Sequence, residues 1–419
     1  MQLVRIRAVT AFISLKRQDF TSNRTTSQES NYYNSELQTK IARAKQILNS
    51  VENELVSAGY EVQTLRIATN PFGEYLATAS SQEKILEDQL SEINSYLAKE
   101  NIDFFAIGPA KTIEEVDSCP IIVSSSHRIS CSAAIGSGTD VAMATKTAEC
   151  MKKISQLGNT ISGDHVKDGL GNFRFCATAC CKSYTPFFPA AMGPSSVVEL
   201  DNNNNIISFS IGLENGKLAK DLLHRSSTTN NISTCFKEGM TETLRPIQNI
   251  CERVSKSTGS LYVGMDTSLN PSLDENGSVA DAIEQIKTVQ KFGGAGSINV
   301  AAEITHALKS LPGIKKVGYC GLMLPVCEDR RLAELASSRE IDTTRLLAIS
   351  SVCGVGLDTI PVPDCTVDRY TSLILDVASL SFRYEKSLSC RLLICPGSKE
   401  GQETQFESPY MCECKIFDI

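Results

Sequence analysis

Apolar residues follow two alternating rhythms along this chain, and the alternation predicts its fold class. From residues 37–55 they recur at helical spacing, with Ser35 placed to cap the helix. The following segment, 60–68, alternates apolar and polar residues in the manner of a strand. Residues 3–6 and 9–15 form a buried strand before the helix by the same criterion. The order strand, helix, strand, helix is typical of parallel sheets.

The same rhythm continues to the end of the chain. We predict further strands at 104–107, 121–125, 172–179, 206–211, 261–265, 317–322 and 391–394. Further helices are predicted from Ser80 to Leu97 and at 140–157, 241–256, 279–291, 298–309, 329–336, 343–350 and 366–384.

Two segments depart from this alternation. The polar stretch 21–34 is expected to form a long surface loop, and 196–199 with 206–211 is expected to form a small surface β-hairpin across an Asn-rich turn. Because no linker separates the two halves, we expect a single α/β domain over residues 1–419. A barrel and a doubly wound sheet both remain open, and in either one a ligand binds at the carboxyl ends of parallel strands.

Composition and charge narrow the range of partners. The chain carries 48 acidic and 41 basic residues, a net charge of -7, whereas a protein that binds the nucleic-acid backbone needs a basic face. No run of 18 apolar residues exists, so we expect no membrane span. The 16 cysteines form no C-x-x-C pair and the four histidines lie far apart, which argues against a zinc finger. Reduced thiols and a cytoplasmic location follow as expectations.

Charged residues at predicted strand ends are the main candidates for chemistry. Arg66, Arg174, Glu214, Asp266 and Asp358 each stand among apolar neighbours. A buried charge is unfavourable unless it is paired or bound to a ligand. These residues are therefore either mutual ion pairs or parts of a site, and the sequence leaves both interpretations open.

Other motifs have a structural interpretation beside a functional one. The turn 292–297, with Gly294 and Gly296, could present N–H groups to an anion, but a tight structural turn is favoured. Glu328 and Asp329 begin a helix, where acids usually act as caps, although they could also bind a divalent ion. The adjacent cysteines Cys180 and Cys181 are most simply part of the core.

The strand-end segments together resemble a known family over nearly the whole chain. The motifs that carry the resemblance are GYEVQTLRIATNPF from Gly59, NFRF from Asn172, PFFPAA from Pro186, IGLE from Ile211, GMDTSLNP from Gly264, FGGAG from Phe292, GLMLPVCED from Gly321 and VCGVGLDTIPVP from Val352. They are similar to those of the domain of unknown function 711 family, which is UPF0210-like. One departure is Pro363-Asp364-Cys365-Thr366, where the family pattern leads us to expect Pro-Gly-Asp-Thr.

The resemblance implies a closed α/β barrel similar to that of pyruvate formate-lyase, with a loop reaching inside, in a cytosolic protein that self-associates. It also suggests a small ACT-type regulatory partner. It implies no reaction. The C-terminal region lacks the R-V-x-G-Y/F segment of glycyl-radical enzymes, so Cys180 and Cys181 have no radical partner.

Two hypotheses about function follow. In the first, the protein is an enzyme acting on a small anionic, carboxylate-type metabolite. Arg66 and Arg174 would clamp the anion. Asp266, Glu214 and either Glu328 or Asp329 would bind a divalent metal ion or move protons, and Asp358 would orient them. Further ligand-binding candidates are Asn70, Ser268, Gly294 and Gly296. In the second hypothesis, the protein is a non-catalytic ligand-binding or scaffold protein whose buried charges stabilise the fold.

Overall fold

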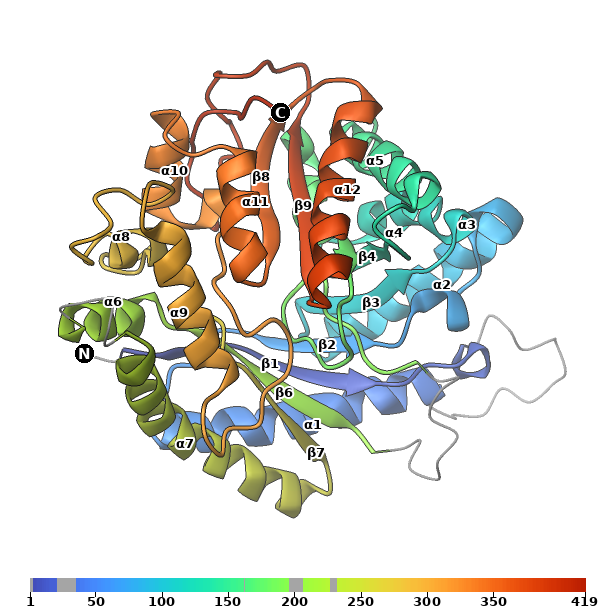
Figure 1. The fold of residues 1–419 in the computed structure, drawn as a ribbon. Helices are drawn as coiled ribbons and strands as arrows, with labels where there is room; N and C mark the ends of the chain where they lie inside the picture. Colours follow the sequence, from blue (N-terminus) through green and yellow to red (C-terminus); the bar gives the residue numbers. More distant parts are fainter. Residues whose placement is uncertain (1–2, 21–34, 162, 196–205, 227–231) are drawn as a thin grey trace, which may run out of the picture.

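A single nine-stranded sheet runs through the computed structural model, which describes residues 3–20, 35–161, 163–195, 206–226 and 232–419 (Figure 1). Its strands come from both halves of the sequence and alternate with helices, as predicted for an α/β protein, but the sheet is mixed and not wholly parallel. They are β1 (Arg5–Ile13), β2 (Leu65–Thr69), β3 (Phe104–Ala110), β4 (Ile129–Ala134), β5 (Phe175–Ala179), β6 (Ser208–Glu214), β7 (Leu261–Asp266), β8 (Gly356–Pro363) and β9 (Leu388–Cys395).

The sheet consists of two groups of strands that run in opposite directions. In the order β7-β6-β1-β2-β3-β4-β5-β9-β8, strands β1 to β5 are parallel to one another. Strand β6 is antiparallel to β1, and β9 is antiparallel to β5. The carboxyl ends of β6 to β9 therefore lie at the same edge as the amino ends of β1 to β5. Side chains distant in sequence meet at this edge.

Residues 316–325 run between the two end strands of the sheet. Isolated bridges join Met265 to Lys316 and Leu269 to Leu322 beside β7, and Pro325 to Asp358 in β8. The predicted strand at 317–322 was wrong, because the segment makes single bridges and no continuous ladder.

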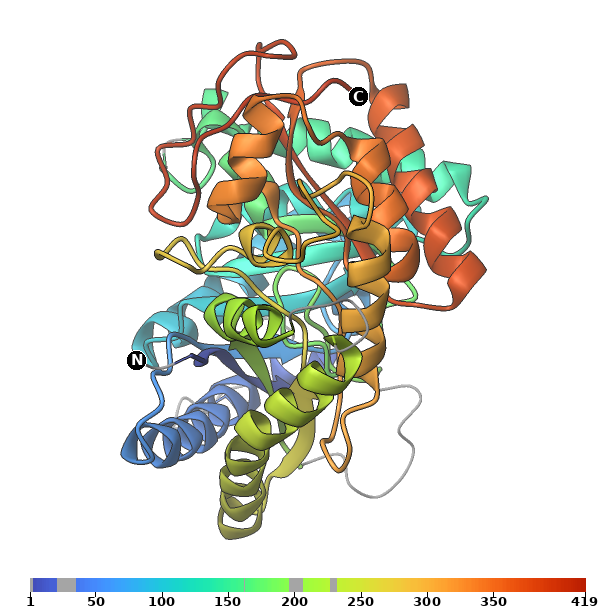
Figure 2. The ribbon, with the colours of Figure 1, turned by 60° about the vertical axis from the view of Figure 1, so that its left-hand side comes forward.

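Twelve α-helices of the described residues surround the sheet (Figure 2). They are α1 (Glu36–Ser57), α2 (Ala79–Lys99), α3 (Ile113–Val116), α4 (Cys119–Ser125), α5 (Val141–Ser155), α6 (Gly216–Arg225), α7 (Ile232–Thr258), α8 (Val279–Ile283), α9 (Ser297–Lys309), α10 (Arg330–Ser337), α11 (Thr343–Val352) and α12 (Val367–Tyr384). Helix α1 begins as predicted, because the Ser35 hydroxyl accepts a hydrogen bond from the N–H of Gln38.

Successive residues of the central strands point to opposite faces of the sheet, and the two faces pack against different parts of the protein. Ile67 and Phe105 belong to the large hydrophobic core that the helices share. Phe12, Ala68 and Ala106 instead pack with Ala191, Tyr184 and Phe188 from the segment between β5 and β6. The Thr10 hydroxyl also donates to the carbonyl oxygen of Pro186. This segment therefore covers the face of β1 to β3 that the helices leave free.

Several predicted elements need correction. Residues 121–125 form the end of α4 and not a strand, because Pro120 begins a helix in this apolar run. Strand β4 follows it instead. Strand β8 was missed, because Gly354 and Gly356 suggested a turn. Helix α8 ends at Ile283, well before the predicted residue 291.

The expected surface hairpin was also wrong for its second half. Strand β6 lies between β1 and β7, and every one of its residues is buried. The predicted first strand of the hairpin, 196–199, lies outside the described residues, as does the polar loop 21–34. The expectation of one domain over residues 1–419 stays a prediction.

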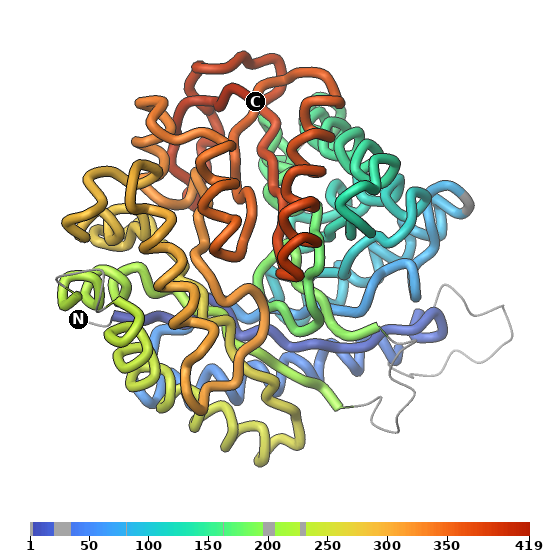
Figure 3. The backbone as a smooth tube through the Cα atoms, in the orientation of Figure 1, coloured from blue at the N-terminus to red at the C-terminus, as the bar shows by residue number. Residues whose placement is uncertain are grey.

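The chain after β9 crosses the top of the molecule beside α10 (Figure 3). Its backbone is held by Cys412, whose N–H donates to the carbonyl oxygen of Cys327, and by Phe417, whose N–H donates to that of Pro361. Among the helices of the described ranges, none combines the length and apolar character that crossing a bilayer requires.

Candidate functional site

Arg66 lies at the start of β2, and its guanidinium is buried with 7% of the residue exposed. The pleat of β2 places it on the same face as Ala68, toward the segment between β5 and β6. Its Nε donates to the Thr64 hydroxyl at 2.8 Å, and that hydroxyl donates to the carbonyl oxygen of Arg7 at 2.5 Å. The backbone of β1 thus fixes the orientation of the guanidinium.

Two aromatic rings flank this guanidinium. Its central carbon lies 4.8 Å from the ring centroid of Phe104 and 5.2 Å from that of Phe188. The rings themselves are edge-on to each other, with centroids 6.2 Å apart. No residue of the described ranges accepts a hydrogen bond from the two terminal nitrogens of Arg66. The rings stabilise the cation, but they supply no hydrogen-bond acceptor for its terminal nitrogens.

An ion-pair chain of five residues, Glu214, Arg7, Glu328, Arg391 and Asp358, lies at the same edge of the sheet. Arg7 donates to Glu214 at 2.8 Å and to Glu328 at 3.1 Å. Arg391 donates from Nη2 to Glu328 at 2.9 Å and from Nε to Asp358 at 2.6 Å. Glu328 ends the short helix η7 (Val326–Glu328), so the chain links β6, β1, η7, β9 and β8.

The lack of an ion pair sets Arg66 apart from this chain. Arg5 also pairs with Glu214 and, in addition, with the exposed carboxylates of Asp274 and Glu61. Arg66 has no ion-pair partner among the described residues. Burial, Arg7 and Arg391 lower the pKa of Arg66, whereas Glu328 opposes that shift. In contrast, Asp358 and Glu328 outweigh burial and raise the pKa of Arg391. No carboxylate of the described ranges forms an ion pair with Arg66 that would offset the burial of its charge.

The structure brings together four of the residues proposed from the sequence: Arg66, Glu214, Glu328 and Asp358. The three carboxylates are in ion pairs, which is one of the two interpretations, whereas Arg66 has no ion-pair partner among the described residues. Sequence reasoning missed Arg7, Arg391, Phe104 and Phe188. Arg391 carried a signal, because it is the one charged residue within the apolar strand β9.

Asp266 and Ser268 form a separate cluster. The Asp266 carboxylate accepts hydrogen bonds from the N–H groups of Ser268, Tyr319 and Cys320, and from the Ser268 hydroxyl at 2.6 Å. Ser268 in turn accepts from the N–H of Gly321. These contacts bind the end of β7 to residues 319–321, so both side chains have a structural role.

Asn70 and Arg174 also satisfy backbone groups. The Asn70 side chain exchanges hydrogen bonds with the N–H and carbonyl of Leu15. Arg174, at the end of the 3-10 helix η5 (Lys167–Arg174), donates to the carbonyl oxygens of Ser126, Ile129 and His165. Arg174 therefore stabilises the loop after α4, and both of its terminal nitrogens donate to backbone carbonyls.

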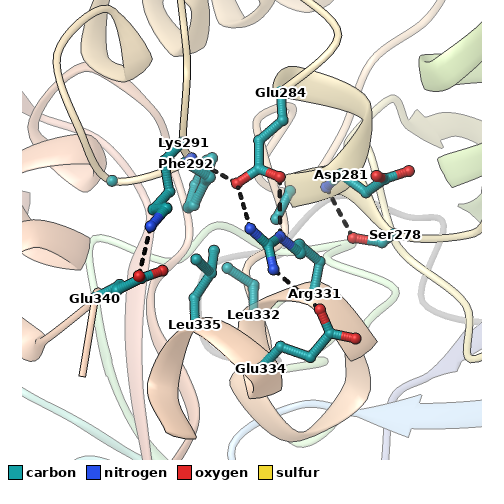
Figure 4. Close-up of polar contacts among 12 residues, drawn as sticks. Ser278, Asp281, Glu284, Lys291, Phe292, Arg331, Leu332, Glu334, Leu335 and Glu340 are labelled. Carbon is teal, nitrogen blue, oxygen red and sulfur yellow. Dashed lines mark hydrogen bonds and ion pairs between the residues drawn. The ribbon is translucent and has the colours of Figure 1, made fainter. Parts of the chain in front are cut away.

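The glycine turn before α9 is held by neighbouring side chains (Figure 4). Glu284 accepts from the N–H of Phe292 at 2.8 Å and from Arg331 at 2.9 Å. The N–H of Gly294 donates to the carbonyl oxygen of Lys291. Gly296 has φ of 89°, and a Cβ there would lie 2.5 Å from the carbonyl oxygen of Thr288. These features explain both glycines as parts of a tight turn.

Asp329 is a helix cap shared by two helices. Its carboxylate accepts from the N–H groups of Arg331 and Leu332 at the start of α10, and from that of Val279 at the start of α8. The capping interpretation is thus the one that the geometry supports. In the described part of the chain, no three His, Cys, Asp or Glu side chains gather in a way that could hold a metal ion.

Comparisons with known proteins agree with the motifs found in the sequence. The family model described as Uncharacterised ACR (DUF711) matches residues 1–407. A UPF0210 protein from Caldicellulosiruptor saccharolyticus is 24% identical over 387 residues, which cover 88% of this chain and 82% of the relative. One from Thermoanaerobacter sp. is 24% identical over 382 residues, with the same coverage. One from Pyrobaculum aerophilum is 29% identical over 236 residues, covering 54% of this chain and 50% of the relative.

Proposed function

Because this chain belongs to the DUF711 family, whose description names no reaction, we propose its function from the geometry of the site: the protein binds a small, carboxylate-type anion at Arg66. A single observation carries the proposal. Arg66 is a buried guanidinium with two terminal nitrogens that lack partners among the described residues. An anion on that edge would supply the missing charge and hydrogen bonds.

The surroundings of Arg66 favour a small monoanion. The centroids of Phe104 and Phe188 lie 4.8 and 5.2 Å from the central carbon of the guanidinium and 6.2 Å from each other, so the two rings cover adjacent sides of it. The ligand that we propose meets the edge that carries the terminal nitrogens. A planar carboxylate matches that edge through two parallel hydrogen bonds. Glu328 is close enough to affect the pKa of Arg66, and its charge would repel a second negative charge on the ligand.

An enzymatic role would use the same side chains. Glu328 is buried, and it lies between Arg7 and Arg391 and near Arg66. It is the carboxyl group best placed to accept or donate a proton on an anion held by Arg66. In this proposal Glu214 and Asp358 orient the arginines on either side of Glu328 and do not contact the ligand.

The test is a comparison of Arg66→Met with the wild-type protein. Binding of acetate, pyruvate and inorganic phosphate is measured by calorimetry, and the melting temperature is measured without added anion. We expect the carboxylates to bind the wild-type protein more tightly than phosphate, and Arg66→Met to reduce carboxylate affinity at least tenfold. Arg43→Met, an exposed change on α1, is the control and should bind like the wild type.

The melting temperature separates this proposal from the scaffold hypothesis. An unpaired buried cation destabilises a protein, so Arg66→Met should melt at the same or a higher temperature. A lower melting temperature with unchanged carboxylate binding would instead mean that Arg66 stabilises the fold, and the proposal would be wrong.

We also propose that residues 316–325 close the sheet into a barrel similar to that of pyruvate formate-lyase. The bridges from Met265 to Lys316 and from Pro325 to Asp358 support it, because they connect both end strands to this segment. Self-association, an ACT-type partner and a cytoplasmic location remain predictions from the resemblance.

A further inference from the structure

Four cysteines gather where the C-terminal segment, residues 396–419, meets the short helix η7. Cys327 lies in η7, Cys395 ends β9, and Cys412 and Cys414 belong to the segment itself. A hydrogen bond with Cys414, burial, and the proximity of Cys412 and Cys395 together raise the pKa of Cys327. These four thiols therefore form one cluster, although they come from three parts of the chain.

Two thiols of this cluster are paired with each other. The sulfur atoms of Cys327 and Cys414 lie 3.9 Å apart, and both residues are fully buried. Within the part of the chain that the structure describes, neither thiol has another hydrogen-bond partner. Thiols elsewhere, such as those of Cys235 and Cys353, donate to backbone carbonyl oxygens instead. A bond between the two sulfur atoms would thus break no other contact of either thiol.

Backbone hydrogen bonds hold both members of the pair in place. The carbonyl oxygen of Cys327 accepts from the N–H of Cys412 at 2.7 Å and from its thiol at 3.2 Å. The N–H of Thr404 donates to the carbonyl oxygen of Cys414 at 2.9 Å, and the N–H of Cys414 donates to the Thr404 hydroxyl at 3.0 Å. Because the sulfur–sulfur length of a disulfide is about 2.05 Å, the two sulfur atoms need to approach each other by about 2 Å. Rotation of the two side chains can supply this movement.

Cys412 connects the buried pair with the solvent. It is half-buried, whereas Cys327, Cys395 and Cys414 are buried, so a reagent meets the sulfur of Cys412 first. Burial raises the pKa of Cys412 to about 12. Because the thiolate is the attacking form of cysteine, reaction at this sulfur is slow at neutral pH and faster at alkaline pH.

We propose that Cys327 and Cys414 are a dithiol that a small organic disulfide oxidises to an internal disulfide, with Cys412 as the entry thiol. The Cys412 sulfur attacks the reagent R–S–S–R, whose S–S bond breaks, and one half leaves as R–SH with the proton of Cys412. Cys327 then attacks the Cys412 sulfur and releases the second half as R–SH. Finally Cys414 attacks the Cys327 sulfur, and Cys412 returns to the thiol with the proton of Cys414. In sum, Cys327 and Cys414 are oxidised and the reagent is reduced to two R–SH.

The internal disulfide would join η7 to the C-terminal segment across 87 residues of sequence. A bond that closes so long a loop restricts the unfolded chain more than the folded one, so the oxidised protein should melt at a higher temperature. Glu328, which belongs to the ion-pair chain, directly follows Cys327. Oxidation would therefore hold this part of the ion-pair chain more firmly. The inference does not depend on an anion at Arg66.

The experiment treats the full-length reduced protein with cystamine at mildly alkaline pH. Free thiols are then blocked with N-ethylmaleimide, and peptide mapping by mass spectrometry identifies linked cysteines. We expect a linked peptide that joins Cys327 to Cys414, that disappears with dithiothreitol, and that accompanies a rise in the melting temperature. Cys412→Ser should form this link at least tenfold more slowly.

Two alanine variants separate the link from other reactions of cystamine. Cys414→Ala should lose both the linked peptide and the rise in melting temperature. Cys251→Ala is the matched control, because Cys251 is also fully buried, and it should keep both. Cys327→Ala serves as a second variant if Cys414→Ala does not fold, and the mapping of the wild-type protein requires no variant.

A second group of paired thiols provides an internal comparison. Cys119 hydrogen-bonds with Cys131 and Cys150, and all three are buried, so we expect them to stay reduced in the folded protein. The proposal would be wrong if the link from Cys327 to Cys414 were absent, or no more abundant than a link between Cys119 and Cys131. It would also be wrong if the rise in melting temperature persisted in Cys414→Ala. An unchanged rate in Cys412→Ser would overturn the entry role of Cys412.

Discussion

Arg66 and Arg391 are both buried guanidinium groups, yet their surroundings shift their pKa values in opposite directions. Arg391 contacts two carboxylates, at 2.9 and 2.6 Å, and these raise its pKa. Arg66 is held by a hydroxyl and two rings, and its pKa falls. The ion pairs of Arg391 explain its burial by stability, whereas for Arg66 we propose a bound anion. Carboxyl groups show the same contrast, because Asp266 is buried with no ion-pair partner among the described residues.

The buried carboxyl group of Asp266 predicts how the stability of the protein depends on pH. Burial outweighs its hydrogen bonds and raises the pKa of Asp266 above the ordinary value of 3.8. At pH values just above 3.8, Asp266 is therefore still protonated in the folded state, whereas it has lost its proton in the unfolded state. Its contribution to stability is present at low pH and is lost as the pH rises through the folded-state pKa.

The measurement compares wild-type protein and Asp266→Asn by urea unfolding between pH 4 and 7. Since Asn does not titrate, we expect the wild-type free energy of unfolding, relative to that of the variant, to fall as the pH rises. Asp164→Asn, at an exposed position, should stay close to the wild type at neutral pH. A relative stability that rises with pH would contradict the prediction.

At the scale of the element, local signals predicted the helices better than the strands. Ser35 marks the start of α1 and Gly59 lies just beyond its end. Both ends could be predicted, because each signal acts within one turn of the helix. Strand β8 and helix α4 were misread, since an apolar run and a Gly-rich turn have the same local pattern in either structure. Asp329 was identified as a cap, but its second helix, α8, lies 50 residues away in sequence and no local signal joins them.

Asp329→Ala tests this shared cap. The change removes acceptors for N–H groups of both α8 and α10, so we expect a loss of about 2–4 kcal/mol in the free energy of unfolding. Asp342→Ala is the matched control, because Asp342 caps only α11 through the N–H of Arg345, and it should cost about 1 kcal/mol. Equal losses, measured by urea unfolding, would mean that one of the two caps on Asp329 contributes nothing.

At the scale of the molecule, the ion-pair chain joins parts that the sequence separates widely. Arg7 lies in β1, Glu214 in β6 and Arg391 in β9, so the chain connects the two opposed groups of strands. The sequence singled out Glu214 and Asp358 as strand-end charges and Glu328 as an acid at a helix start, so three of the five residues of the chain could be predicted. Their partners could not be predicted, because pairing follows from strand order, and strand order depends on contacts hundreds of residues apart.

Arg391→Met is the test of this role. It leaves the buried carboxylates of Glu328 and Asp358 without their shared cation, so we expect a loss of about 3–5 kcal/mol in the free energy of unfolding. Arg369→Met is the control, because its ion pair with Asp418 is exposed, and it should cost less than about 1 kcal/mol. Urea unfolding followed by both circular dichroism and fluorescence should give a single transition for each variant. If Arg391→Met were as stable as Arg369→Met, the ion-pair chain would not hold the two groups of strands together, and Arg391 would join Arg66 as a candidate for ligand binding.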